Sequence, residues 1–376
     1  MIAKKPPLGW NTWNTFGENI NEALILETAD KMIEYGYKDA GYEYVVIDDC
    51  WALKKRGVDG RLVPDPEKFP HGMKYIADYL HERGLKFGMY SCAGTLTCAG
   101  YPSSYGHEYV DAKTFAEWEV DYLKYDFCNF PLSGNCKNAY LTMSMALRSC
   151  GRDILFAACN WGMENPWEWM RSIGAHMYRS TGDILDSFTS FKDILLSQEK
   201  NFSMSTPGCY NDIDMLTVGM YGKGNTGIKN GCTDEEYKLQ FALWCMFSAP
   251  LMMGGDIRNM NDFCKNLMQN KELLAIDQDE EGRPPYALAI WGNENIKMYF
   301  KFMSDNQFAV MFVNFEDEKR TVHLSLPDIG LPADCGKQLE LHDVFTGEYA
   351  GILHESLRID VEPHSCVLYK GKMINA

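Results

Sequence analysis

The sequence predicts an α/β fold in which a (β/α)8 TIM barrel is followed by a C-terminal antiparallel β-sandwich domain. Up to about residue 280, apolar strand-like runs alternate with amphipathic helical segments, and eight such β–α units can be counted. Alternation of this kind indicates a parallel sheet with both faces covered, and eight units are typical of a closed barrel. After Arg283-Pro284-Pro285 the segments become short and strand-like. An open doubly wound sheet is the alternative for the first part, but no G-x-G-x-x-G motif follows the first strand.

The length of the chain supports a division into two domains. Its 376 residues exceed the size at which a single core stops growing, which is roughly 250–300 residues. We expect a barrel domain over residues 1–283 and a sandwich domain over residues 284–376.

The barrel strands are expected where short apolar runs end in polar or aromatic residues. Tyr44–Ile47, for example, is continuously apolar and stops at Asp48-Asp49. The full set of expected strands is Leu8–Trp13, Tyr44–Ile47, Leu85–Tyr90, Tyr122–Asp126, Ile154–Cys159, His176–Arg179, Asn211–Leu216 and Ala249–Met253.

The intervening helices are indicated by apolar residues at a 3.6-residue period and by end signals. Glu22–Tyr35 has Asn21 as a possible N-cap and Gly36 as a stop, and Pro166 suits the first turn of a later helix. The other expected helices are Met73–Arg83, Ala112–Trp118, Asn165–Ser172, Phe188–Gln198 and Glu235–Phe247.

In the second domain, turn signals such as G-N-E-N, S-D-N, E-D-E-K and T-G-E separate the strands, and no helix is expected between them. A structural role is favoured for this domain over carbohydrate binding. The expected strands are Leu288–Trp291, Ile296–Lys301, Gln307–Asn314, Thr321–Ser325, Leu339–Asp343, Tyr349–Ile352, Leu357–Val361 and Ser365–Tyr369.

Composition excludes several classes of function. A net charge of −16 argues against nucleic acid and anionic membranes as partners. No run reaches the roughly 20 apolar residues that span a membrane. The 13 cysteines include no C-x-x-C pair, so a structural zinc site is not expected. No secretory leader is recognised after Met1–Pro7, so a cytoplasmic location is expected for the chain as given, and secretion if a leader has been removed.

Polar side chains gather at the C-terminal ends of the expected strands, which is where barrel enzymes carry their active sites. In the stretch V-D-Y-L-K-Y-D-F-C, Lys124 and Asp126 are two positions apart. Alternate residues of a strand point to the same face, so these two side chains share one face. A nearby cation lowers the pKa of a carboxyl, and an ionised carboxylate suits a nucleophile. An ordinary salt bridge at a strand end is the alternative. The residues gathered in this way are Asp48, Asp49, Tyr90, Lys124, Asp126, Cys159, Trp161, Arg179, Asp183 and Asp214.

Six motifs resemble glycoside hydrolase family 27 of clan D, in order and spacing, from about Pro7 to the end of the chain. They are L-G-W-N-T-W, Y-V-V-I-D-D-C-W, G-M-Y-S, T-C-A-G-Y-P-S-S-Y-G, L-K-Y-D-F-C and N-D-I-D-M-L. The resemblance implies a retaining hydrolase with Asp126 as nucleophile and Asp183 as acid/base, their carboxyl groups roughly 5–5.5 Å apart. We expect the pKa of Asp183 to be raised in the free enzyme.

The resemblance also implies a pocket for one terminal α-galactose. Asp48 and Asp49 would accept hydrogen bonds from O4 and O6, and Arg179 would donate to O2 or O3, with Asp214 as a nearby acceptor. No cofactor and no metal are implied, and the partners are galactose-terminated oligosaccharides or glycoconjugates, with a homo-oligomer possible. The substrate-binding set is Trp13, Asp48, Asp49, Tyr90, Cys98, Lys124, Cys159, Trp161, Arg179 and Asp214.

Specificity within the family is read from Cys159-Asn160-Trp161. Bulky residues there resemble the galactose-cleaving pattern, because they crowd the sugar's 2-position, whereas members that cleave N-acetylgalactosamine carry small residues. The α-N-acetylgalactosaminidases and β-L-arabinopyranosidases of the family are the alternatives. A non-catalytic sugar-binding protein is a remote one, disfavoured because Asp126 and Asp183 are both present.

The resemblance further implies a disulfide between Cys98 and Cys128, although a cytoplasmic location argues against a stable one. Cys50 is expected to lack a partner. The family's usual W-N-D-P-D-M-L is replaced by Y-N-D-I-D-M-L. A carboxylate metal site made of Asp48, Asp49, Asp212 and Asp214 is a disfavoured alternative.

Overall fold

The computed structural model describes residues 2–288, 293–332 and 334–376. The chain divides into two compact units: Met1–Gly231 with Pro250–Asn261, and Cys232–Ala249 with Asp262–Ala376. The helices and strands of each unit are described separately below. Because this division assigns residues 232–249 and 262–283 to the second unit, the domain boundary expected at residues 283/284 stays a prediction.

The first unit is built on eight parallel strands, as predicted. Their order in the sheet is β7-β6-β5-β4-β3-β2-β1-β8, and a parallel bridge between Leu216 and Met253 joins the segment after β7 to β8. The sheet therefore curls round into a barrel. Its strands are β1 Leu8–Asn11, β2 Tyr44–Val46, β3 Lys86–Cys92, β4 Tyr122–Asp126, β5 Leu155–Cys159, β6 Met177–Arg179, β7 Tyr210–Asp212 and β8 Leu251–Met253.

Large side chains fill the inside of the barrel. Tyr44 and Tyr122 from β2 and β4 pack with their ring centroids 5.4 Å apart, and Met177 and Met252 belong to the same buried cluster. Gly88 on β3 makes room for this layer, because a Cβ there would approach a Val46 methyl group to 2.6 Å. The interior is thus largely a packed core.

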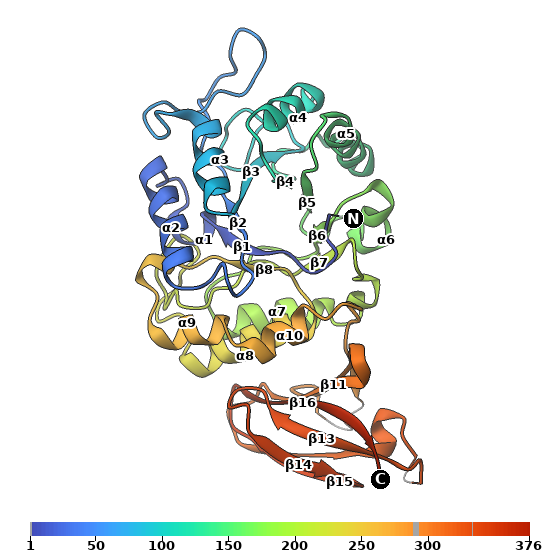
Figure 1. The fold of residues 1–376 in the computed structure, drawn as a ribbon. Coiled ribbons are helices and arrows are strands. Elements are labelled where there is room, and N and C mark those ends of the chain that lie inside the picture. Colours follow the sequence, from blue (N-terminus) through green and yellow to red (C-terminus); the bar gives the residue numbers. More distant parts are fainter. Residues whose placement is uncertain (1, 289–292, 333) are drawn as a thin grey trace. The chain divides into compact units, whose positions relative to one another are not determined.

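Helices α2 to α6 lie around the outside of strands β1 to β6 (Figure 1). Sequence reasoning missed α5, although its buried residues recur at helical spacing and Asn135 caps it by accepting a hydrogen bond from Asn138 N. It also missed α1, which follows β1 because the Asn11 side chain accepts from Trp13 N and ends the strand. The helices of this unit are α1 Trp13–Phe16, α2 Glu22–Glu34, α3 Gly72–Glu82, α4 Glu108–Glu117, α5 Cys136–Ser149, α6 Pro166–Ile173 and α7 Phe188–Gln198, with 3-10 turns η1 Asn201–Met204 and η2 Ile257–Asn259.

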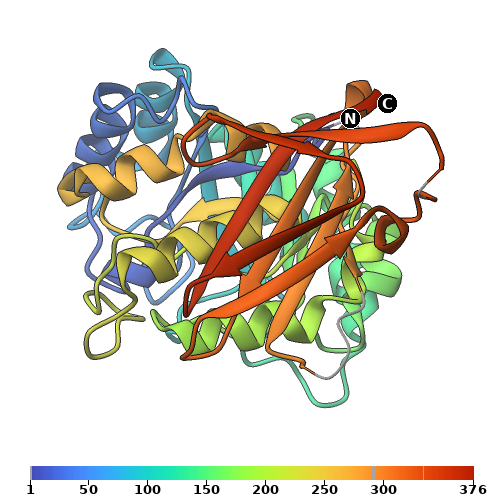
Figure 2. The same cartoon turned by 90° about the horizontal axis from the view of Figure 1, so that it is seen from below.

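The second unit combines an antiparallel sandwich with helices. Figure 2 shows its crossing strands in orange to red. A six-stranded sheet, β14-β13-β16-β11-β10-β9, and the pair β12-β15 contribute side chains to one apolar core, as a sandwich requires. The strands are β9 Tyr286–Leu288, β10 Ile296–Phe302, β11 Gln307–Asn314, β12 Arg320–Ser325, β13 Lys337–Asp343, β14 Tyr349–Leu353, β15 Ser356–Val361 and β16 Ser365–Asn375, and the helices are α8 Asp234–Met246, α9 Asp262–Met268 and α10 Lys271–Asp277.

Two expectations for the sandwich need correction or stay open. The 3-10 turns η3 Ser304–Asn306 and η4 Leu326–Ile329 interrupt the strands, whereas no helix was expected there. η4 forms because Ser325 and Asp328 cap one another's backbone. Residues 289–291 of the expected strand Leu288–Trp291 lie outside the described residues. Among the described helices of the whole chain, none is long and apolar enough to cross a membrane.

Candidate active site

One enclosed pocket at the C-terminal ends of the barrel strands brings together all twelve predicted site residues. Sequence reasoning missed three further lining residues, Asn14, Met215 and Thr226. Asn14 lies on α1, and Thr226 lies in the loop after β7, where it donates its backbone N–H to Asn14 O at 2.9 Å. Asn14 and Thr226 do not lie at the end of an expected strand, so nothing in the sequence pattern pointed to them. The pocket is lined by Trp13, Asn14, Asp48, Asp49, Tyr90, Cys98, Lys124, Asp126, Cys159, Trp161, Arg179, Asp183, Asp214, Met215 and Thr226.

A roomier hollow exists elsewhere on the same unit. It has a volume of about 880 Å³ and lies where β5 and β6 begin. Among the described residues that line it, Asp153 carries the one carboxylate, beside Arg148, Arg152 and His176. A single carboxylate does not make an acid/base pair, so the chemistry belongs to the smaller pocket.

Asp126 ends strand β4 and is held by three donors. Tyr90 Oη donates to Oδ2, while Trp161 Nε1 and Phe127 N donate to Oδ1, each at 2.9 Å. The residue is only 5% exposed. Burial raises the pKa of the Asp126 carboxyl, and this outweighs the opposing effects of the Lys124 charge and of the hydrogen bonds. Both oxygens are therefore oriented, which suits a fixed nucleophile.

The charge of Lys124 favours ionised Asp126, as the sequence predicts, but no ion pair between the two forms in the described residues. Lys124 Nζ donates to Asp48 Oδ2 at 2.9 Å. Burial would lower the pKa of Lys124, but the adjacent Asp48 charge prevails and raises it. The alternation correctly placed both side chains of β4 at the pocket.

Asp183 lies at the rim, after β6, with its side chain 70% exposed. Arg179 donates to its Oδ1 at 2.7 Å and also contacts Asp214 Oδ2 at 2.7 Å. Partial desolvation would raise the pKa of Asp183, but the charge and hydrogen bond of Arg179 prevail and lower it. The expectation of a raised pKa in the free protein is therefore wrong for this arrangement, because the sequence did not reveal that Arg179 and Asp183 pair.

The adjacent carboxylates Asp48 and Asp49 are 1% and 2% exposed and are held by backbone groups. Asp49 accepts from Cys50 N at 2.7 Å and from Ala99 N at 2.9 Å, and burial raises the pKa of its carboxyl. Asn11 Nδ2 donates to Asp48 Oδ2 at 2.7 Å. Two fixed acceptors thus line one wall and are suited to bind hydroxyl groups.

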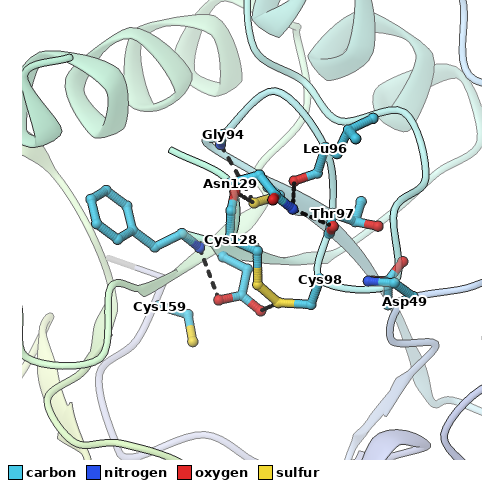
Figure 3. Close-up of a disulfide and its surroundings, with 12 residues drawn as sticks. Asp49, Gly94, Leu96, Thr97, Cys98, Cys128, Asn129 and Cys159 are labelled. Carbon is cyan, nitrogen blue, oxygen red and sulfur yellow. Dashed lines mark hydrogen bonds between the residues drawn. A yellow bond between two sulfur atoms is a disulfide. The ribbon is translucent and has the colours of Figure 1, made fainter. Parts of the chain in front are cut away.

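The disulfide between Cys98 and Cys128 is present, as the resemblance implied, with Cα atoms 5.0 Å apart. Figure 3 shows it with Asn129, whose amide donates to Thr97 O at 3.0 Å and so fixes the same loop. The bridge ties the loop after β3 to the residues that follow Asp126. Cys50 is free, as expected.

Carboxylate and sulfur clusters give little support for a metal. Within the described chain, Cys98, Asp126 and Cys128 form the one grouping with suitable atoms, and its two sulfurs are joined in the disulfide. The alternative site that would include Asp48 and Asp212 is not among such groupings. Asp212 faces the barrel interior, where burial raises its pKa to about 6.

The loop after β5 brings Cys159 and Trp161 to the pocket, whereas the side chain of Asn160 turns away from it. Asn160 is fully buried and its Nδ2 donates to Met163 O. Trp161 has a left-handed backbone, with φ of 58°. That conformation is uncommon for a bulky residue and persists where the surroundings hold it. Here it directs the indole onto Asp126.

Comparison with known proteins identifies the family of the chain. Residues 5–279 match a family model described as alpha galactosidase A, and residues 293–370 match the alpha galactosidase C-terminal beta sandwich domain. An alpha-galactosidase of Cyamopsis tetragonoloba is 40% identical over 98% of this chain and 86% of its own length, and alpha-galactosidase A of Cellvibrio japonicus is 39% identical over 98% and 92%. The crystal structure of alpha-galactosidase I from Mortierella vinacea superposes with a TM-score of 0.92, at 34% identity, over 98% of this chain and 97% of that one.

A structure of the Saccharomyces cerevisiae enzyme with raffinose has a TM-score of 0.91 at 29% identity, covering 99% and 98% of the two chains. A β-L-arabinopyranosidase from Geobacillus stearothermophilus, at 24% identity and a TM-score of 0.86, shares the fold. On the family models and the curated relatives, the chain belongs to the alpha-galactosidase family of glycoside hydrolases, glycoside hydrolase family 27.

Proposed function

We propose that the protein is a retaining exo-α-galactosidase that removes terminal α-linked galactose from oligosaccharides or glycoconjugates. One observation carries the proposal: a single enclosed pocket contains both Asp126 and Asp183. Asp126 is buried and accepts three hydrogen bonds, whereas Asp183 is a carboxylate at the rim. Two carboxyl groups in these two settings are what a double displacement needs.

In the first step, an oxygen of Asp126 attacks the anomeric carbon. The bond from that carbon to the glycosidic oxygen breaks, and Asp183 transfers its proton to the departing oxygen. The galactose is then held as an ester of Asp126. In the second step, Asp183 takes a proton from water, the hydroxide attacks the anomeric carbon, and Asp126 leaves as a carboxylate. Two inversions release galactose in its original α configuration.

The role of Asp183 requires that it become protonated, although Arg179 stabilises its ionised form in the empty pocket. Binding of the substrate changes the surroundings of Asp183 in two ways. A sugar hydroxyl at O2 or O3 that accepts from Arg179 withdraws a donor from Asp183, and the sugar also displaces water around it. Both changes favour the protonated acid.

Selection of galactose rests on four residues that line the pocket. Asp48 and Asp49 are fixed acceptors for O4 and O6. Cys159 and Trp161 crowd the region assigned to the 2-position, which disfavours an acetamido group.

The test compares p-nitrophenyl α-galactoside with p-nitrophenyl α-N-acetylgalactosaminide, using Asp126→Ala as control. We expect strong preference for the galactoside and its abolition in Asp126→Ala. Preference for the acetamido sugar would overturn the specificity argument while leaving the nucleophile in place. A folded protein inactive on both would contradict the proposal and favour an arabinopyranosidase or a binding protein.

A further inference from the structure

A second hollow, of about 690 Å³, opens beside the sugar pocket over helix α7. Trp161 and Asp183 line both cavities, so the two adjoin at these side chains. We call this hollow the α7 groove. Its other walls include Trp167 of α6, Leu185 of the loop before α7, and the polar residues Ser187, Thr189, Ser190 and Asp193.

The position of Asp183 decides what the groove can receive, and this step rests on the function proposed above. A general acid must lie within hydrogen-bonding reach of the oxygen it protonates. The glycosidic oxygen therefore lies at Asp183, with the galactosyl ring on the enclosed side. The leaving group must continue outward from Asp183, and the groove begins there.

We propose that the α7 groove binds the leaving group and selects hydroxyl-rich saccharides, with Trp167 and Asp193 as specificity-determining residues. The volume of about 690 Å³ falls in the range of small-molecule sites, which is about 300–1,000 Å³. A nitrophenyl group would fill only its entrance, whereas a disaccharide leaving group would reach along α7.

The composition of the walls matches a saccharide. Trp161 is 36% exposed and Leu185 44%, so apolar surface is available to cover the C–H faces of sugar rings. The exposed carboxylate of Asp193 and the hydroxyls of Thr189 and Ser187 offer polar atoms along the same side. Amphipathic rings and hydroxyl-bonding groups together suit a polyhydroxylated ligand.

The segment that carries Asp183 is fixed to both cavities. Ile184 N donates to Asp214 Oδ2 at 2.7 Å on the pocket side, and Leu185 N donates to Ser190 Oγ at 2.9 Å on the α7 side. Binding in a preorganised groove costs little ordering, so its contacts can contribute to the transition state for bond cleavage.

The experiment compares kcat/KM for raffinose, whose leaving group is a disaccharide, with kcat/KM for p-nitrophenyl α-galactoside. We expect Trp167→Ala to lower the raffinose/nitrophenyl ratio about 10-fold, equivalent to ~1.4 kcal/mol in the transition state. Asp193→Asn should lower it in the same direction. Tyr109→Ala is the matched control, because Tyr109 is 52% exposed on α4 and lines neither cavity, so the ratio should not change.

Thr189→Trp tests the same idea by filling the groove from an exposed position of α7. It should depress raffinose hydrolysis selectively, whether or not Trp167→Ala folds. Equal losses on both substrates, an unchanged ratio in Trp167→Ala and Thr189→Trp, or a wild-type protein that cleaves the nitrophenyl galactoside but not raffinose would each overturn the groove assignment. Absence of any galactosidase activity would instead refute the function on which it rests.

Discussion

Tyr90→Phe tests how the protein holds its nucleophile. The substitution removes one hydroxyl from a side chain that is 1% exposed and leaves the ring in place. That hydroxyl donates to Asp126 Oδ2 at 2.9 Å. A hydrogen bond to a charged group contributes about 1.5–3 kcal/mol, and ~1.36 kcal/mol corresponds to one pKa unit. Loss of the hydrogen bond from Tyr90 should therefore raise the pKa of Asp126 further, by roughly one to two pKa units.

The assay is the pH dependence of kcat/KM on p-nitrophenyl α-galactoside, whose acidic limb reports ionisation of the nucleophile in the free enzyme. Because Asp126 must be ionised to attack, a higher pKa moves the acidic limb to higher pH, by about one to two pH units. Activity that Tyr90→Phe loses on the acidic side should then be largely recovered at higher pH.

Tyr125→Phe is the matched control, because Tyr125 is a neighbouring buried tyrosine whose hydroxyl has no hydrogen-bond partner within the described residues. It should leave the limb in place. A Tyr90→Phe profile with an unmoved limb and a plateau lowered equally at every pH would refute the reasoning, since the hydroxyl would then act on geometry alone.

Three further predictions concern stability and are measured by urea or thermal unfolding. Lys124→Met strands the buried Asp48 carboxylate and should cost about 3–5 kcal/mol, with much of it restored by adding Asp48→Asn; strictly additive losses would contradict this. Burial raises the pKa of Asp212 to about 6, above its unfolded value, so folding stability is lost as pH rises from about 4 to 6. Asp212→Asn should therefore stabilise the protein by about 2–3 kcal/mol at pH 7 and little at pH 4; a pH-independent effect would speak against it. Replacing Cys98 and Cys128 by alanine, which opens a loop of sequence separation 30, should cost about 3–4 kcal/mol, and no change in midpoint would show that the bridge is dispensable.

The barrel and the gathering of the predicted residues at one pocket could be predicted because both follow from one rule. Strands such as Tyr122–Asp126 are marked by apolar runs, and parallel strands bring their carboxyl ends to one edge. Residues far apart in sequence, such as Asp48 and Arg179, therefore line the same pocket. The helix α5 was missed even though its spacing was readable, because its polar residues obscured the apolar face.

The pairing of charges could not be predicted. Lys124 is two residues from Asp126 but reaches Asp48, and Arg179 binds Asp183 as well as Asp214. Long side chains choose partners by the three-dimensional arrangement of neighbours, and several carboxylates compete for each cation. The pKa of Asp183 is lowered and not raised for this reason, whereas at Asp126 burial outweighs the lowering effect of the Lys124 charge. Loop residues such as Thr226 carry no periodic signal and were missed as well.

The most direct test of the central claim is to trap the covalent intermediate. The protein would be treated with an activated fluorinated α-galactoside, which forms the glycosyl-enzyme quickly and hydrolyses slowly, and then digested and analysed by mass spectrometry. We predict one galactosyl label, on the peptide that contains Asp126, and its absence in Asp126→Ala. A label on another residue, or no label together with β-galactose as the first product by NMR, would contradict a double displacement through Asp126.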